Sequence, residues 1–316
     1  MKIEVVLILV AIILLSISSY LLYNSYFSQT HYFKDNSEQN NHSIEQNINN
    51  SSVLLNEYPE GMLFYDFIRF PDKIINYSID VNCNKNREEN IASAFSYIQN
   101  ETILRFNQVN DNGQIESTCS EDSIEMSGGY FIAGEGGPFL IINTTKYQVI
   151  VNGKILIFSD EKCDRPIVEI HEILHVLGFK HSINKKSIMY NISDCSQIIT
   201  DNIKMKINEL YKDPSLPDLE FKDVNATKKG MYVDFEAEII NSGLSKSGNT
   251  KLSVYSDNEK VSSYDLGSLD IGSGKLITVE NLRVFGSPKN MIFIIDEENS
   301  LSEINKKNNK RILTLQ

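Results

Sequence analysis

Several residue types that often build functional sites are scarce in this sequence of 316 residues. Tryptophan is absent, histidine occurs five times and cysteine four times, and no basic run offsets a formal net charge of −12 and an isoelectric point near 5. Such a chain is repelled by polyanions, which argues against nucleic acid and an anionic membrane surface as partners. The large apolar side chains come instead from 15 tyrosines and 15 phenylalanines.

The start of the chain predicts export. Residues 5–23 form a nearly unbroken apolar run of 19 residues, long enough to cross a bilayer as a helix, with Lys2 as its only basic flank. Small residues at Ser16 and Ser18 offer a cleaved signal peptide as the alternative, although the run continues beyond them. We expect residues 1–23 to be an uncleaved transmembrane anchor that leaves the rest of the chain at the cell surface. If the segment is cleaved, the protein is secreted.

Residues 24–53 are rich in Asn, Gln, Ser and Glu. Such a segment cannot bury enough apolar surface to offset the entropy lost on ordering. We therefore predict a disordered polar stalk, followed by two globular domains at residues 54–213 and 218–316. The short proline-marked segment between positions 213 and 218 separates these domains.

The cysteines all lie between positions 83 and 195, and none is spaced as C-x-x-C, which argues against a zinc site made of cysteine. An even number of cysteines in an exported chain favours disulfides, and four cysteines permit three pairings. We predict the bridges Cys163–Cys195 and Cys83–Cys119. The first of these would clamp the two ends of the segment that contains most of the histidines.

Three of the five histidines stand in one motif, H-E-x-x-H-x-x-G-x-x-H, at residues 171–181. Residues four apart in a helix share a face, so His171 and His175 can present two imidazoles to one metal ion. Glu172 is turned about 100° away from His171 and would face a water on that metal as a general base.

The third histidine of the motif requires the helix to end before it. On a continuing helix His181 would point about 240° away from His175, but Gly178 can take a positive φ, end the helix and return the chain under the metal. Three histidines leave a fourth position open for water, as a catalytic zinc requires. H-E-x-x-H alone arises by chance in roughly one such chain in a few hundred, so Gly178 and His181 make the pattern specific.

This motif, with S-I-M-Y at residues 187–190, resembles the metzincin zinc endopeptidases and is most similar to their matrixin branch. The resemblance implies one catalytic Zn²⁺ held by His171, His175 and His181, with Glu172 as base and proton shuttle. It also implies that Met189 lies in a turn beneath the metal.

The same resemblance implies a polypeptide substrate that pairs with an exposed strand, which we place within residues 130–145. Matrixin zymogens cap their zinc with a free cysteine, and many matrixins bind a second, structural zinc. The stalk has no cysteine and the chain has no spare histidines, so neither feature is expected here. The sequence does not indicate a calcium site.

Hydrophobic patterns around the motif predict an α+β domain, a mixed twisted sheet with an active-site helix. That helix would run from Asp164, its N-cap, to Leu177. Asn152-Gly153, between two apolar runs, predicts a hairpin turn. We expect strands at residues 73–81, 104–106, 139–142, 147–151 and 155–158, and further helices at residues 87–97 and 201–211.

Beyond residue 218 the pattern changes to short strands separated by Gly, Asn and Ser, which predicts an all-β immunoglobulin-like sandwich. The segments I-I-N-S-G at residues 239–243 and E-I-N-K-K-N-N at residues 303–309 resemble CARDB-type domains, although Lys306 replaces a usual Glu. The resemblance implies an adhesion, spacer or substrate-presenting module with a surface protein or glycan partner. The expected strands are residues 219–224, 231–240, 251–255, 261–266, 275–284, 291–296 and 312–315.

Together these features predict a membrane-anchored zinc endopeptidase that hydrolyses extracytoplasmic proteins. The alternative is a non-catalytic adhesion or binding protein of the cell surface, in which the sandwich makes the contacts and the zinc site is a relic.

Overall fold

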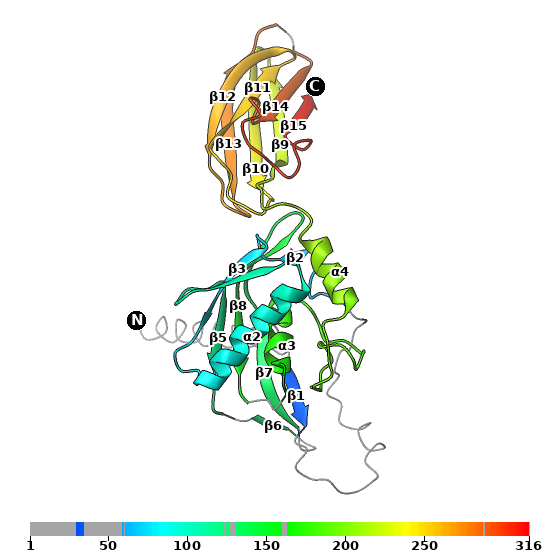
Figure 1. The fold of residues 1–316 in the computed structure, drawn as a ribbon. Helices are drawn as coiled ribbons and strands as arrows, with labels where there is room; N and C mark the ends of the chain where they lie inside the picture. Colours follow the sequence, from blue (N-terminus) through cyan, green and yellow to red (C-terminus); the bar gives the residue numbers. More distant parts are fainter. Residues whose placement is uncertain are drawn as a thin grey trace, which may run out of the picture. The chain divides into compact units, whose positions relative to one another are not determined.

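The computed structural model describes residues 30–34, 59, 61–122, 124–126, 130–159, 163–286 and 288–315, which divide into two compact units (Figure 1). Of the described residues, the first unit comprises those up to residue 65 and those within 73–140 and 151–209. The second unit comprises those within 66–72, 141–150 and 210–315. The predicted anchor at residues 1–23 lies outside the described residues. Among the described residues, no helix combines the length and the apolar character needed to span a bilayer.

A mixed β-sheet underlies the site. Its strand order is β1-β7-β8-β5-β3-β4, with β2 paired to β8 and β6 paired to β7. Parallel pairing joins β3 to β4 and β5, and β5 to β8, whereas β1 and β6 run antiparallel to β7. The strands are β1 (Thr30–Lys34), β2 (Ile68–Arg69), β3 (Ile74–Ile79), β4 (Arg105–Gln108), β5 (Ile115–Cys119), β6 (Ile124–Met126), β7 (Tyr130–Asn143) and β8 (Gln148–Ile157).

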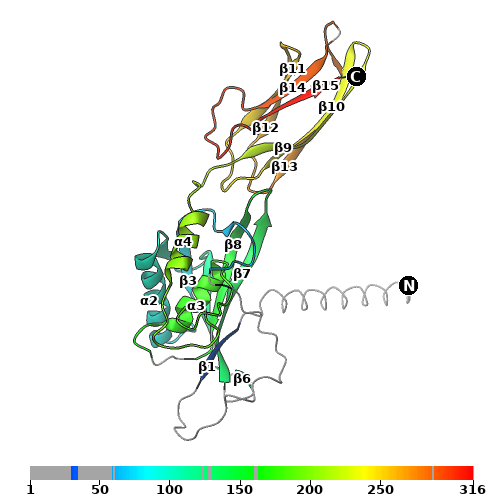
Figure 2. The same ribbon diagram turned by 90° about the vertical axis from the view of Figure 1, so that its right-hand side faces the viewer.

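Helices cover one face of this sheet, as the view along its edge shows (Figure 2). α2 (Lys85–Glu101) begins at Asn84, whose side chain accepts a hydrogen bond from Arg87 N at 3.0 Å. Its buried residue Phe95 stacks on Tyr77 of β3, with ring centroids 3.8 Å apart. α3 (Ile167–Val176) packs beside α2. α4 (Asp201–Leu210) ends one residue before the predicted end.

The predicted hairpin turn at Asn152-Gly153 is wrong, because both residues lie inside β8. The turn between β7 and β8 forms instead at Thr144–Tyr147, where Thr144 N donates to Tyr147 O at 2.9 Å. A Cβ on Gly153 would lie 2.2 Å from Cγ1 of Val176 in α3. The glycine is therefore explained by close packing of strand and helix rather than by turn geometry.

The predicted N-cap of the active-site helix, Asp164, is also wrong. α3 begins at Ile167, and Pro166 occupies the cap position without a side-chain hydrogen bond. The ring of Pro166 holds φ at −76°, and the N–H that proline lacks has no acceptor at a helix start. All ten residues of α3 are buried, so the helix is enclosed on every side rather than along one apolar stripe.

β1 lies within the segment predicted to be a disordered stalk, residues 24–53. Its sequence, T-H-Y-F-K, contains β-branched and aromatic residues, which favour extended backbone. Its partner β7 begins about a hundred residues later in the chain, and local composition carries no information about such a distant pairing. The remaining stalk residues lie outside the described ones.

Both predicted disulfides form. Cys83, just before α2, is bonded to Cys119 at the end of β5. Cys163, just before α3, is bonded to Cys195 across 32 residues of sequence. The second bridge closes a loop around the whole histidine motif, and the chain contains no free cysteine.

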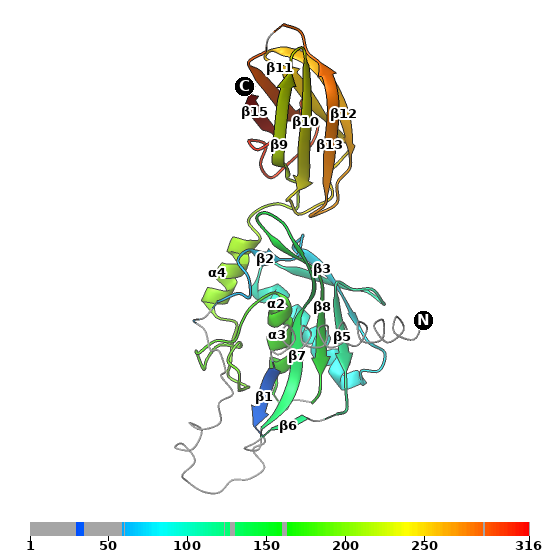
Figure 3. The ribbon, with the colours of Figure 1, turned by 180° about the vertical axis from the view of Figure 1, so that it is seen from behind.

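The second unit contains the predicted sandwich, and all seven predicted strands are present (Figure 3). One sheet has the order β13-β10-β9 and the other β12-β11-β14-β15. A core of buried apolar side chains, including Phe235, Val254 and Phe293, lies between them. The strands are β9 (Leu219–Lys229), β10 (Tyr232–Asn241), β11 (Thr250–Ser256), β12 (Glu259–Gly267), β13 (Gly274–Arg283), β14 (Asn290–Ile295) and β15 (Lys310–Thr314).

Asn241, at the end of β10, is fully buried, and its side chain makes four hydrogen bonds. Its Oδ1 accepts from the backbone N–H groups of Asp218 and Gly243, each at 3.1 Å. Its Nδ2 donates to the carbonyls of Ser245 at 2.8 Å and Leu269 at 2.9 Å. One side chain thus satisfies the backbone of three loops at one end of the sandwich.

Replacing this amide tests that role. Asn241→Ala leaves four buried backbone groups without this partner, so we expect a loss of about 3 kcal/mol in the free energy of unfolding of the sandwich. Urea denaturation followed by circular dichroism measures it. The control Asn225→Ala, on the exposed side of β9, should change stability by less than about 0.5 kcal/mol. Equal midpoints for the two variants would contradict the role assigned to Asn241.

Candidate metal centre

The histidines of the motif converge because the helix ends where the glycine stands. His171 and His175 lie one turn apart on α3, with ring centroids 4.5 Å apart. Gly178 has a φ of 99°, and its N–H donates to His175 O at 2.9 Å. The reversal brings the ring of His181 to 4.7 Å from that of His175 and 5.2 Å from that of His171.

These three side chains form the one group of potential metal ligands found among the described residues. Their ligand atoms all lie within 4.8 Å of one another, and all three residues are buried. The Nε2 atoms of His175 and His181 are 3.2 Å apart. This spacing allows the three imidazoles to share one ion.

Backbone carbonyls hold two of the rings and decide their tautomers. Nδ1 of His171 lies 2.6 Å from Ile188 O, and Nδ1 of His175 lies 2.7 Å from Phe179 O. A carbonyl oxygen can only accept, so both Nδ1 atoms carry the proton. Each Nε2 therefore presents a lone pair toward the cluster, which is the arrangement of metal-ligating histidine.

The methionine turn supports this arrangement. Ile188, which accepts from His171, precedes Met189, and Met189 is 1 % exposed. Its carbonyl accepts from Ser182 N at 2.7 Å, directly after His181, and its N–H donates to Ser187 Oγ at 3.1 Å. The turn is thus bonded to two segments that carry the histidines.

Glu172 lies beside the histidines and is fully buried. Neither of its carboxylate oxygens has a hydrogen-bond partner among the described residues. A Cβ on Gly134 of β7 would lie 2.9 Å from Glu172 Cγ, so only a glycine admits the side chain there. Burial raises the pKa of Glu172 well above its usual range, and the charges of Glu135 and Glu169 add to the rise.

Sequence reasoning missed the two neighbouring carboxylates and the glycine. Glu169 is 1 % exposed and stands three residues before Glu172, a helical spacing that could have been read from the motif. Glu135 and Gly134 come from a strand about 35 residues earlier in the chain. Only their position in the glycine-rich segment 134–137 hints at close approach to another element.

The donor set suits zinc. Neutral imidazole nitrogens are common zinc ligands, and three of them match a catalytic site in which a coordination position stays open. His171, His175, His181 and Glu172 are therefore brought together as the motif predicts. A buried carboxylate without a partner is costly unless it serves chemistry, and here it adjoins the cluster.

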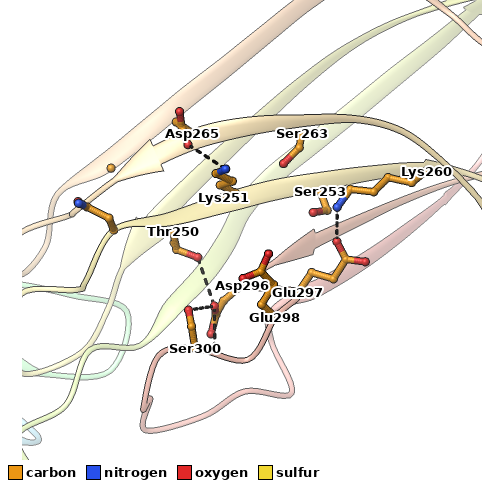
Figure 4. A pocket seen from close by; sticks show the side chains of 12 residues that line it. Thr250, Lys251, Ser253, Lys260, Ser263, Asp265, Asp296, Glu297, Glu298 and Ser300 are labelled. Atoms are coloured by element: carbon orange, nitrogen blue, oxygen red, sulfur yellow. Dashed lines mark hydrogen bonds and ion pairs between the residues drawn. The ribbon is translucent and has the colours of Figure 1, made fainter.

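A separate polar pocket lies on the sandwich (Figure 4). Its charged side chains pair with one another. Lys251 approaches Asp265 at 3.9 Å and Lys260 approaches Glu297 at 2.5 Å, while Asp296 accepts from Ser300 N at 3.0 Å. These contacts account for the carboxylates of Asp265, Asp296 and Glu297 by ion pairing and hydrogen bonding.

Comparisons with known proteins agree with the motif and with the resemblances inferred from sequence. Residues 70–212 match the family model for matrixin, and residues 216–312 match the model for CARDB. The match to matrixin supports a zinc metalloprotease at the level of the family. No curated protein sequence matches the chain significantly.

Solved structures similar to this chain include zinc proteases and CARDB domains. A CARDB domain from Pyrococcus furiosus, in complex with di-metal ions, has 21% identity, with 32% of this chain and 90% of that chain covered and a TM-score of 0.28. Myroilysin has 13% identity, coverage of 49% and 88%, and a TM-score of 0.30. The hatching enzyme zinc-protease HCE-1 of Oryzias latipes has 16% identity, coverage of 35% and 46%, and a TM-score of 0.22.

The burial of His181 predicts how acid affects the metal-free protein. Burial lowers the pKa of His181 to about 4, against about 6.5 in the unfolded chain. The unfolded state then binds a proton that the folded state does not, so stability is lost as the pH falls from 6.5 to 4. We expect this group to contribute about 3 kcal/mol over that window.

Comparison with His181→Gln isolates this contribution from opposing groups such as Glu172. Denaturant unfolding of the metal-free proteins between pH 7 and 4 should show that the free energy of unfolding falls more steeply with decreasing pH for the unsubstituted chain than for the variant. Identical slopes for the two proteins would refute the assignment.

Proposed function

We propose that this protein is a zinc-dependent endopeptidase that cleaves polypeptides. The match of residues 70–212 to the matrixin family model supports this proposal. The observation that carries the proposal is Glu172, a fully buried carboxylate without a hydrogen-bond partner among the described residues, beside three converging histidines. A purely structural metal site has no use for such a group.

His171 and His175 would hold the ion through Nε2, and His181 through a ring nitrogen. The three ligand atoms lie within 4.8 Å of one another. Zinc bound there would supply Lewis acidity that polarises a peptide carbonyl and lowers the pKa of a water. The carbonyls of Ile188 and Phe179 keep two imidazoles neutral and oriented for this role.

Glu172 acts as the proton carrier. Its carboxylate accepts a proton from the water that attacks the scissile carbonyl, and it then donates that proton to the leaving amine. Burial strengthens the base by raising its pKa, while the positive charge of a nearby dication opposes that shift and keeps the carboxylate ionised.

The sandwich serves as a non-catalytic module of this enzyme. Its match to CARDB and the absence of potential metal clusters from its described residues support a role in adhesion, spacing or substrate presentation. A surface protein or glycan is the partner that we propose for it.

Substitution of the base tests the proposed reaction. Glu172→Ala should lower kcat on a peptide library at least about 100-fold, because general-base catalysis is lost. Zinc content, measured by atomic emission, should remain one ion per chain. The matched control Glu209→Ala, on the surface of α4, should retain full turnover.

Chelation completes this test. Casein or peptide turnover that disappears with a zinc chelator and returns with Zn²⁺ supports the proposal. A protein that binds one zinc but shows no chelator-sensitive turnover would instead support a relic site in a surface-binding protein.

We further propose that residues 1–23 anchor the chain in a membrane with both units exported. The apolar run and the two disulfides, which persist in oxidising compartments, support this location. The expressed chain should sediment with membranes, resist a carbonate wash and dissolve in detergent, whereas deletion of residues 3–23 should leave it soluble. Recovery of soluble exported protein with a new N-terminus near Ser18 would establish the cleaved signal instead.

A further inference from the structure

We propose that β1 (Thr30–Lys34) occupies, within the same chain, the sheet edge at which a peptide substrate would pair, and thereby restrains the peptidase. The inference rests on the proposed function. It concerns how access to that site is regulated by a segment that lies more than a hundred residues before the metal ligands in sequence.

β1 covers the outer edge of β7. The strand order places β1 last in the sheet, next to β7 (Figures 1 and 3). Pairing is antiparallel and runs from Thr30, opposite Glu135, to Lys34, opposite Tyr130, with a bulge after His31. Backbone groups on this edge of β7 are therefore engaged by the chain itself over residues 130–135.

The covered part of β7 adjoins the proposed base. His31 lies opposite Gly134, and a Cβ on Gly134 would be 2.9 Å from Cγ of Glu172. A Cβ on Gly136 would be 2.4 Å from Glu172 O. β1 also contacts α3, the helix that carries Glu172. A polypeptide paired at this edge therefore lies next to the catalytic machinery.

Strand addition recognises backbone rather than particular side chains, so an internal strand and an extended substrate compete for the same N–H and C=O groups. Because β1 belongs to the same chain as β7, its local concentration at this edge is higher than that of a free substrate. Residues 35–58 join β1 covalently to the rest of the chain, and a covalent tether of this length maintains an effective concentration of order millimolar. Extended substrates at lower concentration would be excluded for most of the time.

The cysteine inventory fits this form of restraint. All four cysteines are engaged in the two disulfides, so no thiol is available to cap the metal. Strand competition requires no thiol. It also predicts a particular kinetic signature, because an occupant that competes with substrate raises KM and leaves kcat unchanged.

Two consecutive prolines test the proposal in the full-length, zinc-loaded protein. Successive residues of a strand point their N–H groups to opposite sides, so Tyr32→Pro with Phe33→Pro removes a donor to β7 whichever residue supplies it. We expect kcat/KM for a short peptide to rise about ten-fold or more through a lower KM. The control, Asn40→Pro with Asn41→Pro, changes the linker but not β1 and should leave KM unaltered.

Hydrogen exchange gives a readout that does not depend on activity. Within residues 130–135, the amides whose N–H groups face β1 should exchange faster in the β1 variant than in the control, because their partner strand is lost. The amides that face the other edge of β7 keep their partners and serve as an internal reference. A synthetic peptide Thr-His-Tyr-Phe-Lys added to the variant should slow this exchange and inhibit turnover competitively. Faster exchange with unchanged KM would overturn the restraint, and unchanged exchange would overturn the pairing itself.

Failure of the proposed function would be recognised separately. If neither protein hydrolyses any peptide, binding of a fluorescent extended peptide to the zinc-loaded proteins still decides the matter. Tighter binding to the β1 variant than to the control supports competition for the edge, and equal binding refutes it.

Discussion

Two hydrogen bonds to backbone carbonyls determine the geometry of the metal centre. Ile188 O and Phe179 O accept from Nδ1 of His171 and His175, and so fix which nitrogen of each ring can bind a metal. Neither carbonyl belongs to the helix that carries the rings. The centre therefore depends on two later segments, the return after the helix and the methionine turn, being in place, although both ligands lie on one helix.

Close approach of strands to α3 depends on residues without side chains. Gly134 and Gly136 of β7 pack against Glu172, and Gly153 of β8 packs against Val176. Their contacts enclose α3 and remove water from the carboxylate, which raises its pKa. Burial of a carboxylate without a partner costs stability. The stability of the surrounding core offsets this local cost, and the buried carboxylate serves the proposed reaction.

Features with a strong local signal could be predicted from sequence. Helical spacing and the glycine at position 178 were enough to bring the ligands together, and alternating patterns located the sandwich strands. Features set by distant contacts could not. Asn152-Gly153 has turn chemistry but lies in a strand, because α3 needs space at Gly153. β1 pairs with a strand about a hundred residues later in the chain. Glu135 approaches Glu172 from a strand about 35 residues before it. No local window of sequence contains either contact.

The disulfide between Cys163 and Cys195 encloses every protein group assigned to the metal, from His171 to Met189, in one covalent loop. In the chain-entropy model, a loop of 32 residues stabilises the folded state by about 4 kcal/mol relative to the reduced chain. Assembly of the centre is therefore linked to the thiol–disulfide potential of its surroundings. In a reducing compartment the same side chains would be held less rigidly. If they bind zinc as proposed, the redox state of this disulfide and the affinity for the metal are thermodynamically coupled.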